Sequence, residues 1–204
     1  PQYGGFSGDN GLATHARLNG PHGLAVDALA NLFIGDYYNN RVRKVDAVTR
    51  VITPVAGNGS NGSSGDGGLA TKAGMFPFAL AVDAGGDLFI ADNPIFSDLT
   101  TYRVRKVDAV TGIITTVAGT GEAGFSGDGG KATGAMLANP AALAVDSAGN
   151  LFIADWNNYR VRKVDVMTGI ITTVAGVGQS EFSGDGGLAT DTGLRGPGGL
   201  AIDP

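Results

Sequence analysis

Four stretches of the chain carry nearly the same sequence, and this internal repeat limits the fold more than any other feature. The motif Ser-Gly-Asp-Gly, or Ser-Gly-Asp-Asn in its first copy, places an aspartate at Asp9, Asp66, Asp128 and Asp185. The spacing is 57 residues between the first two and between the last two copies, and 62 between the second and third. Such a period indicates a repeat architecture in which each copy is one supersecondary unit.

Each unit holds four short apolar runs separated by turn residues. In the third unit the runs are Ala142–Val145, Leu151–Ala154, Val161–Val164 and Ile170–Ala175. Runs of four to six residues suit strands and are too short for helices. The 35 glycines of the 204 residues recur between these runs, which indicates tight turns joining the strands of an antiparallel meander.

The second run of each unit, such as Leu151–Ala154, is apolar at every position. A strand of this kind must be covered on both faces, whereas a sheet with one wet face would alternate. Blades stacked around an axis cover each other in this way. We therefore predict an all-β fold, a β-propeller of four-stranded antiparallel blades in a single region, 1–204. The predicted blades are 21–57, 77–119 and 140–176, with the start of a next blade at 197–204.

The repeated residues resemble the NHL repeat along essentially the whole chain. The pattern is Gly-Leu-Ala-Val-Asp, then Asn-Leu-Phe-Ile-Ala-Asp, then Arg-Val-Arg-Lys-Val-Asp and Thr-Gly-Ile-Ile-Thr-Thr-Val-Ala-Gly. The resemblance implies a propeller, usually of six blades, whose first strands line a central channel. It also implies a binding platform, since family members are mostly ligand or protein platforms, some bind RNA, and a few relatives are lyases or hydrolases. The family's Asp…Asn…Arg motif maps onto Asp36, Asn39 and Arg41 and onto Asp155, Asn158 and Arg160, while the middle unit has Thr101 at the Asn position.

Three units have all four strands, and a fourth contributes a loop and one predicted strand, Gly199–Asp203. Propellers typically have four to eight blades. The favoured expectation is that the chain is part of a longer, six-bladed ring. Two alternatives stay open: two copies of the chain closing one ring, and open, fibre-like assembly through unlike ends.

The glycine-rich loop before each first strand contains the repeated aspartate, preceded by an aromatic at Phe6, Phe125 and Phe182. One aspartate supplies too few of the six to eight oxygens that Ca²⁺ takes. We expect the aspartate to cap a turn or a short helix at Leu-Ala-Thr, and the phenylalanine to fill the gap between blades. No cofactor is predicted, and Ca²⁺ is only a weak alternative.

Three basic triplets follow the second loop of each unit and hold nine of the 14 lysines and arginines. They are Arg41/Arg43/Lys44, Arg103/Arg105/Lys106 and Arg160/Arg162/Lys163. A basic belt for anions or RNA is one interpretation. The net charge of −5 favours the other, cross-strand pairing with aspartates, so nucleic acid is not an expected partner.

Loops between the second and third strands are the predicted binding sites, because loops on a rigid scaffold commonly carry function. Aromatic and asparagine side chains gather there, and Tyr and Trp suit protein or sugar ligands. The alternative is that these aromatics pack over neighbouring blades. The candidate binding residues are Tyr37, Tyr38, Asn40, Phe96, Tyr102, Trp156, Asn157 and Tyr159.

Catalysis has little support in the sequence. His15 and His22 are the two histidines, there is no cysteine, and a zinc site normally needs three protein ligands. We expect a non-catalytic binding or scaffolding propeller for a protein or carbohydrate. The alternatives are a lyase or hydrolase completed by further blades, and a self-assembling structural protein. No apolar run is long enough to span a membrane. Resemblance to glycine-rich NHL arrays of secreted proteins suggests a bacterial protein in an extracellular or periplasmic place.

Overall fold

The computed structural model describes residues 5–94 and 101–203. Its contacts divide the chain into two compact units. Unit 1 consists of Pro1–Asp92 with Lys106–Thr115, and unit 2 of Asn93–Arg105 with Thr116–Pro204. The boundary cuts the second repeat, so parts of its strands β7 and β8 belong to each unit.

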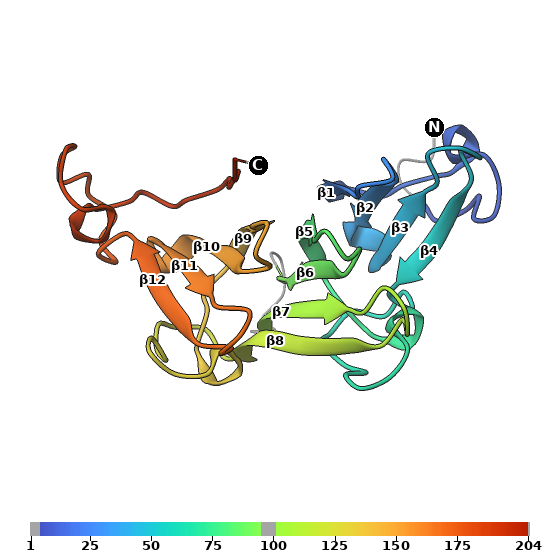
Figure 1. The fold of residues 1–204 in the computed structure, drawn as a ribbon. Coiled ribbons are helices and arrows are strands. Elements are labelled where there is room, and N and C mark those ends of the chain that lie inside the picture. The colour runs from blue at the N-terminus through green and yellow to red at the C-terminus, as the bar shows by residue number, and fades with distance from the viewer. Residues whose placement is uncertain (1–4, 95–100, 204) are drawn as a thin grey trace. The chain divides into compact units, whose positions relative to one another are not determined.

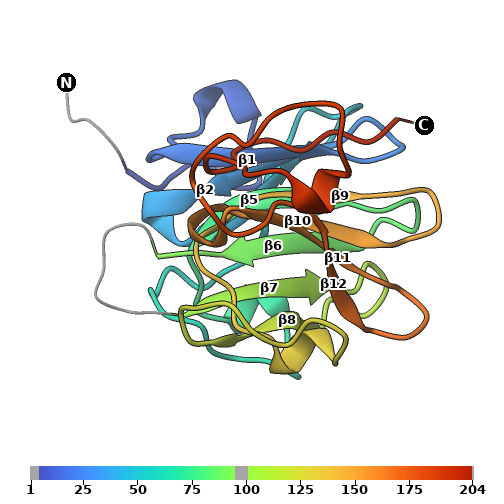
Figure 2. The same ribbon diagram turned by 90° about the vertical axis from the view of Figure 1, so that its left-hand side faces the viewer.

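Three four-stranded antiparallel sheets follow one another along the chain, and in each the strand order is the sequence order (Figures 1 and 2). The first sheet comprises β1 (Pro21–Val26), β2 (Leu32–Asp36), β3 (Arg41–Val45) and β4 (Ile52–Ala56). The second comprises β5 (Pro77–Val82), β6 (Leu88–Asp92), β7 (Tyr102–Val107) and β8 (Ile114–Gly121). The third comprises β9 (Pro140–Val145), β10 (Leu151–Asp155), β11 (Arg160–Val164) and β12 (Ile171–Ala175). The predicted meander of short strands is confirmed.

The second strand of each sheet is covered on both faces, as its unbroken apolar sequence predicts. In β6 every residue from Leu88 to Asp92 is buried, with no more than 6% of any residue exposed. In unit 1, β5 also packs against β1 of the preceding sheet. Because stacked sheets bury both faces of this strand, its sequence lacks the apolar–polar alternation of a strand with one solvent-exposed face.

A buried apolar cluster in unit 1 joins side chains of the first and second sheets. Its members come from seven strands and from the segment that connects the sheets: Phe33, Val42, Ala56, Ala70, Ala73, Met75, Leu80, Leu88, Ile90, Val107 and Ile114. Each sheet alone has too little interior to exclude water from both faces. The stacking of repeats thus provides the core.

Turns at one end of each sheet are closed by aspartate side chains. The turn between β1 and β2 has Asp27, whose carboxylate accepts hydrogen bonds from the amides of Leu29 and Asn31. In the turn between β3 and β4, Asp46 accepts from both the amide and the hydroxyl of Thr49. These hydrogen bonds from Thr49 lower the pKa of Asp46. The high aspartate content of the chain therefore reflects repeated turn closure.

Each glycine-rich loop runs along the outer edge of the sheet that it precedes. Before the first sheet, the Asn10 amide donates to the Ile52 carbonyl and the Ile52 amide donates to the Gly11 carbonyl. Before the second sheet, the Gly67 amide donates in the same way to the Ile114 carbonyl. Such pairing provides hydrogen-bond partners for the backbone amides and carbonyls of an edge strand that would otherwise be unpaired.

A short 3-10 helix follows in each of these loops, at the predicted Leu-Ala-Thr position. The four helices are η1 (Ala13–His15), η3 (Ala70–Lys72), η4 (Ala132–Gly134) and η6 (Ala189–Asp191). Their N-cap residues are Leu12, Leu69, Lys131 and Leu188, and none of them makes a side-chain capping bond. The prediction that the loop aspartate caps this helix is therefore wrong.

The predicted fourth strand, Gly199–Asp203, is not a strand in the structure. The corresponding segments of the first three repeats lie in β1, β5 and β9, where a second strand of the same repeat pairs with each of them. Within the described residues, this last copy has no second strand of its own. Extended backbone without a pairing partner is not a β-strand.

Candidate ligand-binding face

A buried arginine in the third strand of the first sheet ties the glycine-rich loop to the strands. Arg43 is fully buried. Its Nη2 donates to the Asp9 Oδ1 atom at 2.5 Å and to the Ser7 carbonyl, and its Nη1 donates to the Arg17 carbonyl. Nη1 also lies 3.4 Å from Oδ2 of Asp36, which is itself fully buried. We call Arg43, Asp9 and Asp36 the first clamp.

The third sheet repeats this arrangement as a second clamp of Arg162, Asp128 and Asp155. Arg162 Nη2 donates to Asp128 Oδ1 at 2.6 Å and to the Ser126 carbonyl, and Nη1 donates to the Met136 carbonyl. Burial raises the pKa of Asp155 to about 6, against the lowering effect of the Asn158 amide, the Ala138 amide and Arg162. A buried carboxylate loses hydration that its partners only partly replace.

The clamps correct two expectations. The middle arginine of the basic triplet is not part of an exposed basic belt, because its side chain is buried in all three sheets (Arg43, Arg105 and Arg162). In the first and third sheets it pairs with a buried aspartate of the neighbouring strand (Asp36 and Asp155), so cross-strand pairing with aspartates is confirmed there. In the first and third sheets, the repeated loop aspartate accepts hydrogen bonds from this arginine (Asp9 and Asp128).

The first arginine of the triplet holds the loops in place, as the family motif implies. Arg41 donates to the carbonyls of Asn39 and Asn58, and its guanidinium carbon lies 4.0 Å from the centre of the Phe6 ring. Arg160 lies 3.8 Å from the centre of the Phe125 ring in the same manner. The repeated phenylalanine therefore stacks on an arginine of its own repeat.

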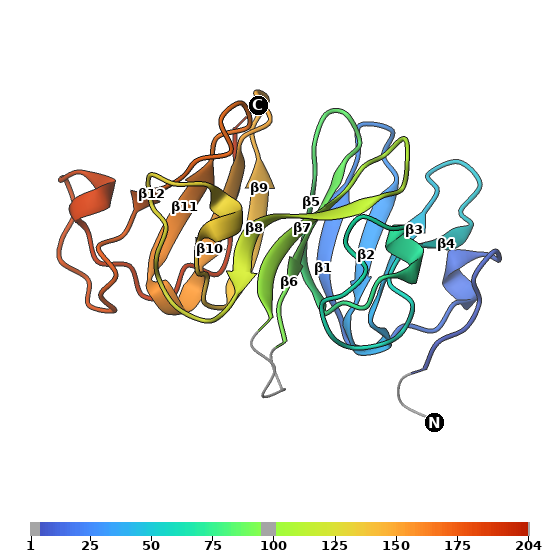
Figure 3. The same ribbon diagram turned by 90° about the horizontal axis from the view of Figure 1, so that it is seen from below.

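The loop between β2 and β3 (η2, Tyr37–Asn39), at one end of the first sheet (Figure 3), carries two of the aromatic side chains of unit 1. Tyr37 is buried, 4% exposed, and its ring contacts the rings of His22, Tyr38, Phe76 and Phe78. Tyr37 thus fixes the rings around it.

Three accessible rings pack against Tyr37, and we call them the aromatic face: His22, Tyr38 and Phe78. Tyr38 is 52% exposed, His22 is exposed and Phe78 is half-buried. The His22 and Phe78 rings are 4.5 Å apart and tilted by 34°. The predicted Asn40 follows η2 with a left-handed backbone, and its side-chain amide donates to the Gly59 carbonyl at 3.3 Å.

The predicted residues of unit 2 form a separate group. Trp156 is 40% exposed, and its ring lies against Gly196 and Gly198, where a Cβ atom would overlap it. Asn157 is exposed and Tyr159 is half-buried. Tyr159 also has a left-handed backbone, φ 53°. Tyr102 is half-buried at the start of β7, and Phe96 lies outside the described residues.

Two members of the aromatic face, His22 and Phe78, were not among the residues predicted from the sequence. They occupy the second position of β1 and β5, where the third sheet has Ala141. Each of these strands otherwise reads Pro-x-x-Leu-Ala-Val. The exchange at one position of this otherwise constant strand was the available signal.

Neither a metal cluster nor a membrane helix is found in the described part of the chain. No group of three or more His, Cys, Asp or Glu side chains within residues 5–94 and 101–203 could hold a metal ion. In the same residues no helix is both long and apolar enough to cross a bilayer.

Comparison with protein families matches residues 120–183 to the Teneurin NHL domain and residues 18–45 to the NHL repeat. Human Teneurin-1 is 31% identical over 218 aligned residues, which cover 97% of this chain and 8% of Teneurin-1. The chain spans only 8–14% of the length of the first curated relatives that it matches.

Solved structures show the same fold at low sequence identity. An auxiliary nutrient binding protein from Bacteroides ovatus superimposes with a TM-score of 0.65 at 18% identity, covering 92% of this chain and 44% of that one. A chain of a nidogen/laminin complex gives a TM-score of 0.52 at 18% identity, covering 76% of this chain and 48% of that one.

Proposed function

Because the chain is made of NHL repeats and belongs to the NHL-repeat family, we propose that it is a non-catalytic binding platform whose aromatic face takes a protein or carbohydrate ligand. The single observation that carries this proposal is the set of accessible rings at His22, Tyr38 and Phe78, seated on buried Tyr37. Rings held by packing lose little conformational freedom on binding. Their flat apolar faces suit sugar rings and apolar side chains.

The structural neighbours support binding as the general role. The protein from Bacteroides ovatus is described as an auxiliary nutrient binding protein, and nidogen was solved in a complex with laminin. Trp156, Asn157 and Tyr159 provide a second candidate surface, in unit 2. An extracellular or periplasmic location is part of the proposal, since such ligands occur there.

The experiment compares paired variants on a glycan array and on immobilised laminin. His22→Ala combined with Tyr38→Ala removes two exposed rings and keeps buried Tyr37. Leu29→Ala is the matched control, because Leu29 is 77% exposed and lies in the turn at the opposite end of the strands. We expect the double variant to lose at least about tenfold in affinity for the probe that binds.

The control should bind as the unchanged chain does, and both proteins should keep their unfolding temperature. Binding of the double variant with undiminished affinity would refute the aromatic face as the site. A matching loss in Trp156→Ala would instead place the site in unit 2.

A further inference from the structure

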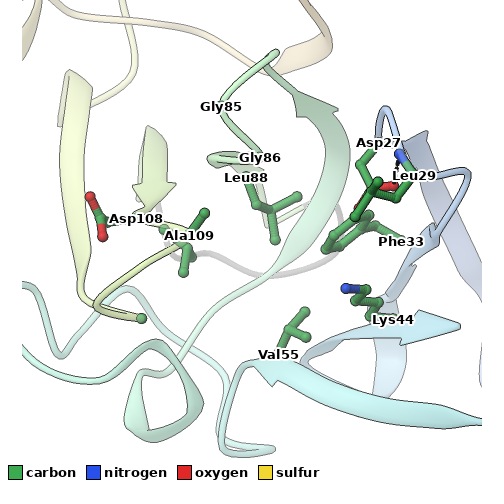
Figure 4. A pocket seen from close by; sticks show the side chains of 12 residues that line it. Asp27, Leu29, Phe33, Lys44, Val55, Gly85, Gly86, Leu88, Asp108 and Ala109 are labelled. Carbon is green, nitrogen blue, oxygen red and sulfur yellow. Dashed lines mark hydrogen bonds between the residues drawn. The ribbon is translucent and has the colours of Figure 1, made fainter. Parts of the chain in front are cut away.

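Unit 1 contains a cavity of about 410 Å³ between the first and second sheets (Figure 4). It lies at the end of the sheets formed by the turns after β1, β5 and β7, opposite the loop that carries Tyr37 and Tyr38. The cavity is therefore distinct from the aromatic face, and its volume is in the range of small-molecule sites.

The walls of the cavity are mainly apolar. Phe33, Leu88 and Val107 line it and are themselves buried, with 7%, 3% and 7% exposed. Val55 adds an aliphatic surface, and Leu29 lies at the accessible rim, 77% exposed. An apolar ligand body would therefore gain contacts with side chains that the fold already holds in place.

One cation points into this apolar space. Figure 4 shows the Lys44 ammonium group directed into the cavity from β3. Its Nζ atom lies 5.7 Å from the centre of the Phe33 ring. Within residues 5–94 and 101–203, the Lys44 ammonium makes no hydrogen bond or ion pair. A cation in an apolar site is well placed to attract an anion.

The second sheet shows how the same lysine is neutralised elsewhere. Lys106, which corresponds to Lys44, pairs with Asp87 at 2.5 Å. In the first sheet the position of Asp87 is taken by Asn31, whose side-chain amide donates to Asp27. The exchange of one residue between repeats thus leaves Lys44, among the described residues, without a carboxylate in direct contact, and Asp27 and Asp46 attract it only from a longer distance.

Two carboxylates at the cavity limit the charge of a ligand. Asp27 accepts hydrogen bonds from Leu29 and Asn31, and Asp108 accepts from Thr111 in its own turn. In Figure 4 the Asp108 carboxylate points away from Lys44. A ligand with several negative charges would be repelled by both acids, whereas a single negative charge can reach Lys44.

We propose that this cavity binds a small amphipathic monocarboxylate, with the carboxylate on Lys44 and the apolar body against Phe33, Leu88 and Val107. The probe is octanoate, and octanol is the uncharged analogue of equal chain length. Titration of the 204-residue chain by calorimetry and ligand-observed NMR gives the dissociation constants. We expect a dissociation constant of about 1 mM for octanoate, which is typical of a ligand of this size.

Three variants assign the binding to Lys44. Lys44→Met keeps most of the stem, and we expect it to weaken octanoate at least about tenfold while leaving octanol unchanged. Asn31→Asp supplies the counter-ion found in the second sheet, and we expect a loss of about fivefold with Lys44 still present. Lys163→Met is the matched control, because Lys163 lies 5.9 Å from the Phe152 ring centre in the same kind of setting and does not line the cavity.

Circular dichroism confirms the fold of each variant, and Asn31→Asp serves as the test if Lys44→Met fails to fold. Octanoate binding that survives both Lys44→Met and Asn31→Asp overturns the proposal. So does an equal loss in Lys163→Met, or the absence of binding at about 10 mM octanoate. Ligands of the aromatic face should bind all three variants as before, so failure here is distinguishable from failure of the proposed function.

Discussion

The first and third sheets share a framework and differ on their surfaces. Each sheet buries one arginine, Arg43 or Arg162, and ties it to a loop aspartate and a buried aspartate with nearly the same bonds. At the second position of the first strand, however, one sheet has His22 and the other Ala141. Repeated residues thus build the blade, and residues that change between repeats build its surface.

The two clamps also differ in one instructive detail. Asp128 accepts two further hydrogen bonds, from the amide and hydroxyl of Thr173. The corresponding residue in the first sheet is Pro54, which has no amide hydrogen to donate. Asp9 therefore depends more heavily on Arg43 than Asp128 does on Arg162.

The largest expected effect follows from breaking the clamps. Arg43→Met leaves buried Asp36 with fewer partners, and we expect the free energy of unfolding to fall by about 3–5 kcal/mol. Arg162→Met should cost less, because Asp128 keeps Thr173. Urea unfolding of both variants measures the difference, and equal or reversed losses would remove the role given to Pro54.

A pH titration sharpens the comparison for the second clamp. Burial raises the pKa of Asp155 from its ordinary value of 3.8 to about 6. Between these two pH values the folded chain keeps a proton on Asp155 that the unfolded chain has released. The stabilising contribution of this proton is complete below pH 3.8 and is lost as the pH rises through about 6, by up to about 3 kcal/mol. Asp155→Asn should abolish this loss in urea unfolding between about pH 4 and pH 7.

Asp46→Asn is the control for that titration. Hydrogen bonds from Thr49 lower the pKa of half-buried Asp46, so its contribution to stability is lost only as the pH falls below 3.8. The pH dependence of Asp46→Asn between about pH 4 and pH 7 should match that of the unchanged chain. A persistent decline in stability in Asp155→Asn would show that another group is responsible.

The smallest effect concerns the repeated phenylalanines. Phe125→Ala removes a ring stacked on Arg160, and we expect a loss of about 0.5–1 kcal/mol in thermal unfolding. Phe182 is 66% exposed and, within the described residues, stacks on no arginine. Phe182→Ala should therefore change the unfolding temperature hardly at all, and an equal loss in both variants would contradict the stacking account.

Much of the fold could be predicted from the sequence because strand length, turn residues and the repeat are local signals. Closure of the repeats into a six-bladed ring stays a prediction. The clamps were missed because Arg43 and Asp9 are 34 residues apart and no local period joins them. Arg162 and Asp128 have the same separation, so a fixed offset between repeats was the available signal.

The candidate site was only partly predictable for a similar reason. Tyr37 and Tyr38 are neighbours in sequence, yet one is buried and the other exposed. Which of two adjacent aromatics packs against Phe76 and Phe78 depends on the following repeat. Exposure is thus decided by contacts between repeats, which a single loop sequence does not contain.

A double-mutant cycle on Asp9 and Arg43 tests most directly the claim that each blade is organised by a buried arginine holding its outer loop. The free energies of unfolding of Asp9→Asn, Arg43→Met and the double variant are compared with that of the unchanged chain in urea. We predict a coupling of at least about 1.5 kcal/mol, because the contact is a charged, largely buried hydrogen bond. Losses that simply add, with no coupling between Asp9 and Arg43, would contradict the account.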